Sequence, residues 1–123
     1  MKSFLAIIAL IGAINTTYVQ ASPETDKQRS LIAYMLIESG KQEQFLKEAE
    51  QVITDSRKES GNITYQLHQS STNPQLFMFY ELFHSQEDLT YHRNAPHTKA
   101  FLAKTKPYTL KFGLEEYQLK EGR

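Results

Sequence analysis

Residues 79–101, FYELFHSQEDLTYHRNAPHTKAF, constrain the fold most, because they change within a few positions from a strand pattern to a helix pattern. The strand, from Gln75 to Phe83, carries large apolar or aromatic residues at both odd and even positions. Such a pattern is typical of a strand that is covered on both faces. The chain is therefore predicted to build a sheet that needs cover on two sides.

The residues after this strand predict a helix in two pieces. Ser85 and Asp88 have the spacing of a capping box, which predicts a short helix that reaches about Arg93. Pro96 suits the first turn of a further piece that runs to about Lys104.

The preceding half of the chain predicts a strand, a helix and a strand. Residues 31–37 are mostly apolar on both faces, as in a central strand. Ser39 and Gln42 have capping-box spacing before a helix that Gly61 is expected to stop. The apolar face of that helix is formed by Phe45, Ala49, Val52, Ile53 and Ser56.

Ile63, Tyr65 and Leu67 alternate with polar residues, which indicates a strand with one wet or interfacial face. Residues 110–119 are predicted to close the sheet as its last strand. The order β-α-β-β-α-β, with the second helix broken, predicts an α+β class fold with the ferredoxin-like split arrangement.

We expect one domain, residues 30–119, with a C-terminal tail at 120–123, since 123 residues can bury one core. Helices on one face of the sheet leave the aromatic residues of its other face uncovered, so a second copy of the chain is the economical cover. A homodimer is therefore predicted.

The N-terminus reads as a secretory signal peptide over residues 1–21. Lys2 precedes eleven residues, 4–14, of apolar character, and Val19-Gln20-Ala21 is a small-residue cleavage site. A bilayer-spanning helix needs about 20 apolar residues, so a membrane anchor is disfavoured. We expect cleavage after Ala21, a flexible lead-in at residues 22–29 and a secreted or periplasmic protein that is free of the membrane.

Charge and cysteine content narrow the function classes. The chain has 14 Lys and Arg against 14 Asp and Glu, without a basic block, so neither nucleic acid nor an anionic membrane surface is an expected partner. It has no cysteine, which excludes disulfides and thiolate chemistry.

Two histidines are candidate catalytic residues. His97 lies three and four positions before Ala100 and Phe101, so on a helix it faces the apolar side, where it is either a core histidine or a pocket acid or base. His92 lies four residues after Asp88, whose carboxylate could orient the imidazole ring, unless the two form only an exposed ion pair. His97 is the stronger candidate because of its apolar face.

Tyr80 and Glu81 are adjacent on the predicted strand and must point to opposite faces, so only one of the two is expected in a pocket. Either could instead be structural, Tyr80 as a core residue and Glu81 as an ion-pair partner between subunits. His92 and His97 are five apart across a proline break, which matches no common metal-ligand spacing, so no metal is predicted.

Residues 79–101, the GNITYQL segment at 61–67 and the helix before it resemble the antibiotic biosynthesis monooxygenase domain over roughly residues 31–119. The H-x-x-x-P-H-x-K run at 92–99 matches the family's run. The resemblance implies a dimeric α+β barrel, no cofactor, catalytic residues among His97, His92, Tyr80 and Glu81, and a substrate pocket that includes Tyr65, Phe101 and Tyr34.

The function that this resemblance implies is cofactor-independent oxidation of a small aromatic quinol or polyphenol by oxygen, with histidine-assisted deprotonation of the substrate. Isomerisation of a dihydroxy-ketone signal, as in the autoinducer-degrading branch of the family, is an alternative, but that substrate is phosphorylated and cytoplasmic. A dimer that binds a small hydrophobic ligand without catalysis is the other alternative.

Overall fold

The computed structural model describes residues 27–121. The predicted signal peptide and its cleavage site, and most of the lead-in, lie outside these residues. None of the helices within 27–121 has the length and apolar character required to cross a membrane. The elements in chain order are β1 (Arg29–Ile37), α1 (Gln42–Arg57), β2 (Asn62–Gln69), β3 (Leu76–Phe83), α2 (Gln86–Asn94), α3 (Pro96–Thr105), the 3₁₀ turn η2 (Lys106–Tyr108) and β4 (Thr109–Gln118).

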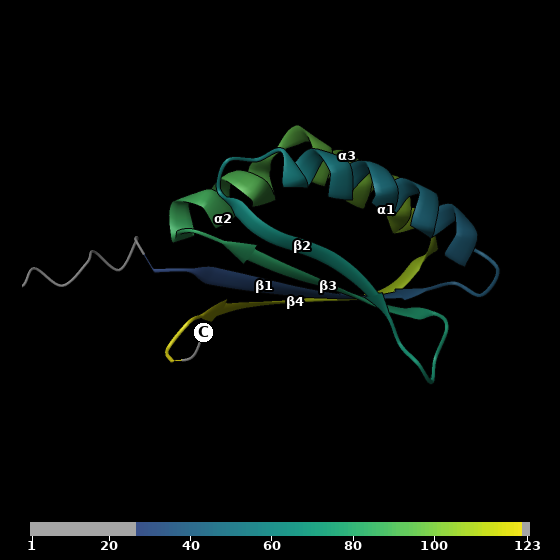
Figure 1. Ribbon diagram of the computed structural model, residues 1–123. Coiled ribbons are helices and arrows are strands. Elements are labelled where there is room, and N and C mark those ends of the chain that lie inside the picture. The colour runs from purple at the N-terminus through teal and green to yellow at the C-terminus, as the bar shows by residue number, and fades with distance from the viewer. Residues whose placement is uncertain (1–26, 122–123) are drawn as a thin grey trace, which may run out of the picture.

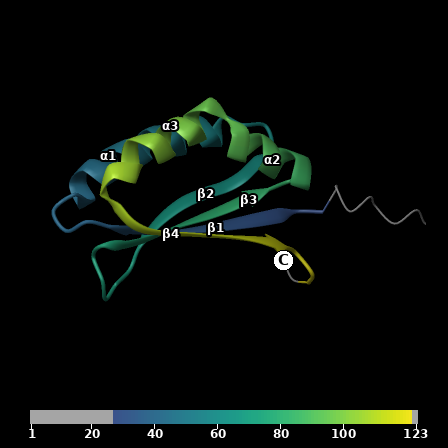
Figure 2. The same ribbon diagram turned by 180° about the vertical axis from the view of Figure 1, so that it is seen from behind.

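The four strands form one antiparallel sheet in the order β2-β3-β1-β4. All three α-helices lie on the same face of this sheet, as both views of the ribbon show (Figure 1 and Figure 2). The α+β class and the ferredoxin-like split arrangement are confirmed, including the break between α2 and α3.

The core lies between the sheet and the helices. Alternate residues of β1 and β3 point into it, and Phe45 of α1 stacks against Phe77 of β3 with ring centroids 4.6 Å apart. Each buried aromatic or aliphatic side chain contributes about 1.5–3 kcal/mol relative to exposure. The fully buried large apolar residues of this layer are Phe45, Phe77, Phe79, Phe83, Met35, Ile37, Leu89 and Val52.

The opposite face of the sheet is only half covered within the described chain. On β3 the residues that alternate with the buried set are of intermediate exposure, and Tyr34 of β1 is 47% exposed. Residues 27–121 thus cover β3 on its helix side alone, whereas cover on both sides was predicted. A second copy as the cover of the other side stays a prediction.

The start of α1 differs from the prediction that Ser39 caps it. The helix begins at Gln42 after Lys41, which makes no side-chain capping hydrogen bond. Gly40 adopts a φ of 89° and turns the chain there, and its N–H donates to the side-chain Oε1 of Gln42 at 2.8 Å. The capping prediction for α2 is confirmed, since the Asp88 backbone N–H donates to Ser85 Oγ at 3.1 Å.

Gly61 does not end α1, which stops at Arg57. Its role is a close approach: a Cβ atom at this position would lie less than 3.0 Å from three side-chain atoms of Asp88, so only glycine lets the turn pack on α2. Two residues later, the Ile63 side chain is 39% exposed, so it does not share a buried face with Tyr65 and Leu67 as the predicted alternation required. The strand register shifts between Asn62 and Thr64, which turns this side chain outward.

Candidate functional site

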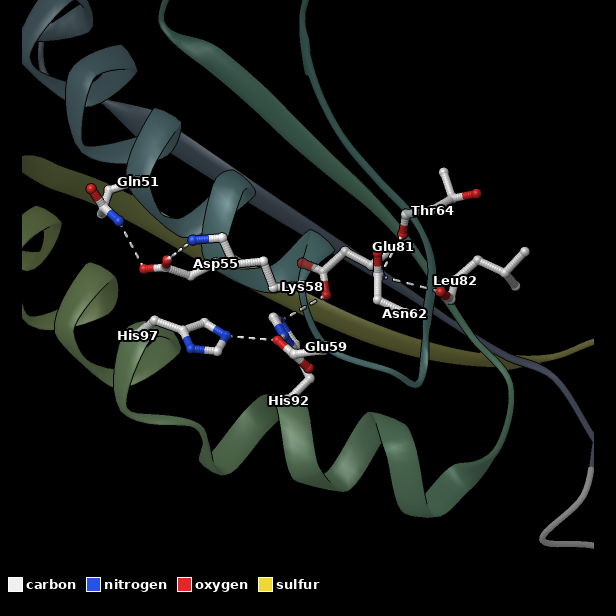
Figure 3. A network of polar contacts seen from close by, with 10 residues as sticks. All are labelled: Gln51, Asp55, Lys58, Glu59, Asn62, Thr64, Glu81, Leu82, His92 and His97. Carbon is white, nitrogen blue, oxygen red and sulfur yellow. Dashed lines mark hydrogen bonds and ion pairs between the residues drawn. The ribbon is translucent and has the colours of Figure 1, made fainter.

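A buried polar network joins the turn after α1 to both C-terminal helices. Glu59 lies in that turn, and its Oε2 atom is 2.8 Å from Nδ1 of His92 and 2.6 Å from Nε2 of His97 (Figure 3). The two histidines reach it from α2 and α3, on either side of Pro96. One carboxylate oxygen therefore connects two imidazole rings.

Glu81 completes the network from the sheet. It lies on the helix-facing side of β3, and its Oε2 atom is 3.2 Å from Nε2 of His92, an ion-pair contact that is not aligned as a hydrogen bond. The side chains of Glu81 and Glu59 are each 4% exposed and that of His92 is 2% exposed. Buried charges are stable only when they are paired in this way.

Two groups of the network, His92 and Glu81, hold a proton more tightly than the same groups do in water. Burial lowers the pKa of His92, but contact with Glu81 and its negative charge, followed by those of Glu59, raise it by more, so the pKa lies above the ordinary 6.5. Burial raises the pKa of Glu81 above the ordinary 4.5, and the nearby His92 only partly opposes this effect. Both shifts favour the protonated form of a buried group, one on β3 and one on α2.

Tyr65 borders the network from β2. It pairs with Glu81 across the two strands, and its ring centroid is 5.3 Å from that of His92. Burial, and then the negative charge of Glu81, raise the pKa of Tyr65 well above its ordinary value of 10.0. Its hydroxyl is therefore a hydrogen-bond donor at every physiological pH.

An open cavity of about 190 Å³ leads to this network between the helices and the strands β1 and β4. Its polar lining is formed by Glu81, His92, Arg93 and Thr98 at one end, whereas the rest is aliphatic or aromatic. Arg93 forms an ion pair with Glu116 of β4. The cavity is thus an apolar chamber with an acid-base pair in its wall.

The structure brings together Glu81, His92, His97, Tyr65 and Phe101 of the predicted site residues, but they do not all face one space. Tyr65 and Phe101 line the cavity with His92 and Glu81. His97 lies behind His92 and borders a separate groove of about 80 Å³ between α1 and α3.

Tyr80 and Tyr34 lie elsewhere. Both project from the face of the sheet that is opposite to the helices, so within the chain neither borders the cavity that was predicted for them. Strand alternation separated Tyr80 from Glu81 as expected, and Glu81 is the member of the pair that reaches the site.

Asp88 does not orient His92, which corrects the expectation from helical spacing. Its carboxylate instead accepts the hydroxyl hydrogen of Ser85 at 2.9 Å, as part of the helix cap. Glu59 orients the ring, and sequence reasoning missed this residue. A single glutamate in a polar turn carries no periodic signal, and only the packing of Gly61 on α2 brings it under the histidine.

Glu59, His92 and His97 also offer three potential metal ligands, with the ligating atoms within 4.8 Å of one another. Two ligand atoms of a tetrahedral ion with bonds of 2.0–2.1 Å lie about 3.3 Å apart. The two nitrogen atoms lie closer than that to Glu59 Oε2, at 2.8 and 2.6 Å. This geometry is that of hydrogen bonds, and a metal would have to separate the groups.

Residues 29–104 match the family model described as antibiotic biosynthesis monooxygenase. The chain is 32% identical over 76 residues to a Bacillus subtilis (strain 168) protein named "Putative monooxygenase YcnE", covering 62% of this chain and 80% of that protein. These matches support a monooxygenase-like oxidoreductase function in general terms.

Solved structures agree in fold. A Nitrosomonas europaea protein titled "Putative antibiotic biosynthesis monooxygenase" matches with a TM-score of 0.72 at 20% identity, covering 76% of this chain and 90% of that one. Protein SO0527 from Shewanella oneidensis matches with a TM-score of 0.73 at 24% identity, covering 76% and 92%. At such identities the likeness concerns the fold alone.

Proposed function

The chain belongs to the antibiotic biosynthesis monooxygenase family, and on that premise we propose that it is a cofactor-independent monooxygenase that oxidises a small aromatic quinol or polyphenol with molecular oxygen. The observation that supports this most is the pair of His92 and Glu81, buried in the wall of a largely apolar cavity. Such a chamber can hold an aromatic ring and remove a proton from its hydroxyl group.

The chemistry balances without a cofactor. A base removes the hydroxyl proton of the quinol, and the anion passes one electron to oxygen. The resulting radical pair combines at a ring carbon to form a peroxide, which loses water. In sum, a quinol and O₂ give a hydroxyquinone and H₂O, so that one ring C–H bond becomes a C–O bond and oxygen is reduced by four electrons.

Each side chain at the polar end of the cavity has a distinct role in this proposal. His92 and Glu81 together accept the substrate proton, because both line the cavity and their side chains lie 3.2 Å apart. The Tyr65 hydroxyl donates a hydrogen bond toward the anion, and Phe101 packs on the ring. We place the base at His92 rather than at His97, since His97 borders the other groove.

A ligand-binding dimer without catalysis, the alternative from the sequence, uses the same cavity. The isomerase alternative is weaker, because a phosphorylated substrate needs cationic partners and the polar end of this cavity contains one, Arg93, which is paired with Glu116. Neither alternative consumes oxygen.

We further propose that the protein is exported and acts as a homodimer. The exposed aromatic and aliphatic residues on the sheet, among them Tyr34 and Tyr117, form the surface that a second copy would cover. Light scattering at low micromolar concentration tests the dimer, and a stable monomer would refute it. Intact mass of protein recovered from its host tests cleavage after Ala21.

Oxygen uptake with a panel of quinols and polyphenols tests the activity. We expect turnover with at least one substrate and a loss of about 10²-fold or more in His92→Gln and in Glu81→Gln, because general acid–base groups contribute on that order. His68→Ala, on an exposed part of β2, is the control. A compound that raises the Tm without oxygen uptake would instead support the non-catalytic binder.

A further inference from the structure

The buried network reaches solvent at one of its four members. The side chains of Glu59, Glu81 and His92 are 4%, 4% and 2% exposed, whereas that of His97 is 20% exposed. While a substrate fills the cavity that His92 lines, a proton on His92 therefore has no direct contact with bulk water. His97 is the point at which the network meets solvent.

His97 faces a different space from that of the cavity. It borders the groove between α1 and α3, whose polar wall includes Glu48, Gln51, Asp55 and Lys104. His92 and Glu81 border the cavity between the helices and the sheet. The network thus passes through the helical layer, from the substrate side to the outer groove, and Figure 3 shows His97 on the far side of Glu59 from Glu81.

The contacts along this path are within the range for proton transfer. Donor and acceptor atoms that exchange a proton lie about 2.6–3.2 Å apart. The path from His92 Nδ1 to Glu59 Oε2 measures 2.8 Å, and that from Glu59 Oε2 to His97 Nε2 measures 2.6 Å. Within residues 27–121 no side chain or backbone group bonds Nδ1 of His97, which leaves that nitrogen for water.

We propose that Glu59 and His97 form a proton exit, through which His92 exchanges protons with water in the groove between α1 and α3 while the substrate fills the cavity. This proposal rests on the proposed function, because it assigns a route to the proton that the substrate loses. His97 is then a relay residue that acts through Glu59 and does not touch the substrate.

The transfer conserves protons at each step, and no electron moves. A proton arrives at His92 Nε2 from the substrate, directly or through Glu81, and the proton on Nδ1 passes to Glu59 Oε2. Glu59 passes a proton to Nε2 of His97, and His97 releases the proton on Nδ1 to water. The reverse sequence returns a proton to the cavity when the peroxide loses water.

The first test does not require a substrate. In full-length protein with ¹⁵N-labelled histidine, NMR measures the exchange with water of the ring proton on His92 Nδ1, the nitrogen that contacts Glu59. We expect His97→Phe to slow this exchange on the order of 10-fold or more, since it removes the acid–base group at the solvent end. The matched control, His68→Phe, replaces an exposed histidine that contacts Gln66 and should leave the exchange unchanged.

His97→Gln separates a relay from a structural role. Glutamine can still donate a hydrogen bond to Glu59 but cannot pass a proton from one ring nitrogen to the other. The relay predicts slow exchange in this variant too, whereas a structural role predicts recovery toward the wild-type rate. Circular dichroism and Tm measurements establish that each variant is folded.

With an active quinol, the oxygen-uptake rate of His97→Gln should fall and should rise again with added imidazole, which can carry protons in the groove. Unchanged ring-proton exchange in a folded His97→Phe protein would overturn the relay and leave the monooxygenase proposal intact. Stoichiometric Zn²⁺ uptake that is lost in Glu59→Gln would overturn it in favour of a metal centre. If no quinol supports oxygen uptake while exchange still depends on His97, the monooxygenase proposal fails and the relay stands.

Discussion

Replacing Gly61 with alanine should displace the turn that carries Glu59 from helix α2. The new Cβ atom would lie less than 3.0 Å from three side-chain atoms of Asp88, where ordinary contacts are 3.4–4 Å. One of these atoms is the Asp88 Cβ, which is fixed to the helix backbone and cannot rotate away. The turn and the helix must therefore separate.

Overpacking of this kind costs about 1–3 kcal/mol, and the rigid neighbour places Gly61→Ala at the upper end. Disturbance of the Ser85 cap on α2 adds up to about 1 kcal/mol. For a domain of this size a total of about 3–4 kcal/mol lowers the Tm by roughly 12–32 °C. The displacement also draws His92 away from Glu59, which removes one cause of its raised pKa.

Urea unfolding measures the cost, and a double-mutant cycle tests its cause. Asp88→Gly removes the atoms that the new methyl group meets, so Gly61→Ala should cost at least about 1 kcal/mol less in that background. Gly40→Asn is the control, because Gly40 has open space around it and needs only a left-handed φ that asparagine tolerates. Equal costs of Gly61→Ala in both backgrounds would refute the close-approach argument.

Three further predictions concern the network and the cap. The pKa of His92 is raised in the folded protein, so its contribution to the free energy of unfolding is complete below about pH 6.5 and is lost as the pH rises through the folded-state pKa. The pKa of Glu81 is also raised, so its contribution to the free energy of unfolding has the same sign and begins to be lost above about pH 4.5. Urea unfolding from pH 5 to 9 should show that the free energy of unfolding falls by at most about 1.4 kcal/mol per pH unit for each group. His92→Gln should flatten this fall above about pH 6.5. A flat wild-type profile would contradict the raised pKa values of His92 and Glu81. Ser85→Ala should lower stability by about 1 kcal/mol through the lost helix cap, and urea titration without a change in midpoint would count against the cap. Treatment with a chelator should change neither the Tm nor oxygen uptake, because the network is held by hydrogen bonds, and a lower Tm would point to a bound metal.

The elements of the fold could be predicted from the sequence because their signals are local. The Ser85 cap, the Pro96 start and the two apolar faces of residues 75–83 each depend on neighbours within a turn or two. The prediction that Ser39 caps the first helix was wrong, because it also relied on a local signal, the spacing of Ser39 and Gln42. A spacing rule does not register that Gly40 turns the chain before the helix begins.

The sequence also predicted His92 and His97 as site residues, but it did not predict their shared partner, Glu59. The H-x-x-x-P-H run marks His92 and His97, and strand alternation required Tyr80 and Glu81 to diverge. Which of that pair enters the site depends on which face of β3 the helices cover. Only the packed layer of helices decided in favour of Glu81.

By itself, therefore, the sequence determined the order of the strands and helices and marked the two histidines of the H-x-x-x-P-H run. The tertiary structure decided the acid–base network, because Glu59 lies 33 residues from His92 along the chain and joins it through the close packing of Gly61 on α2. Periodicity reports which face of an element is buried. It carries no information about which buried groups of different elements meet, since that depends on how the elements pack.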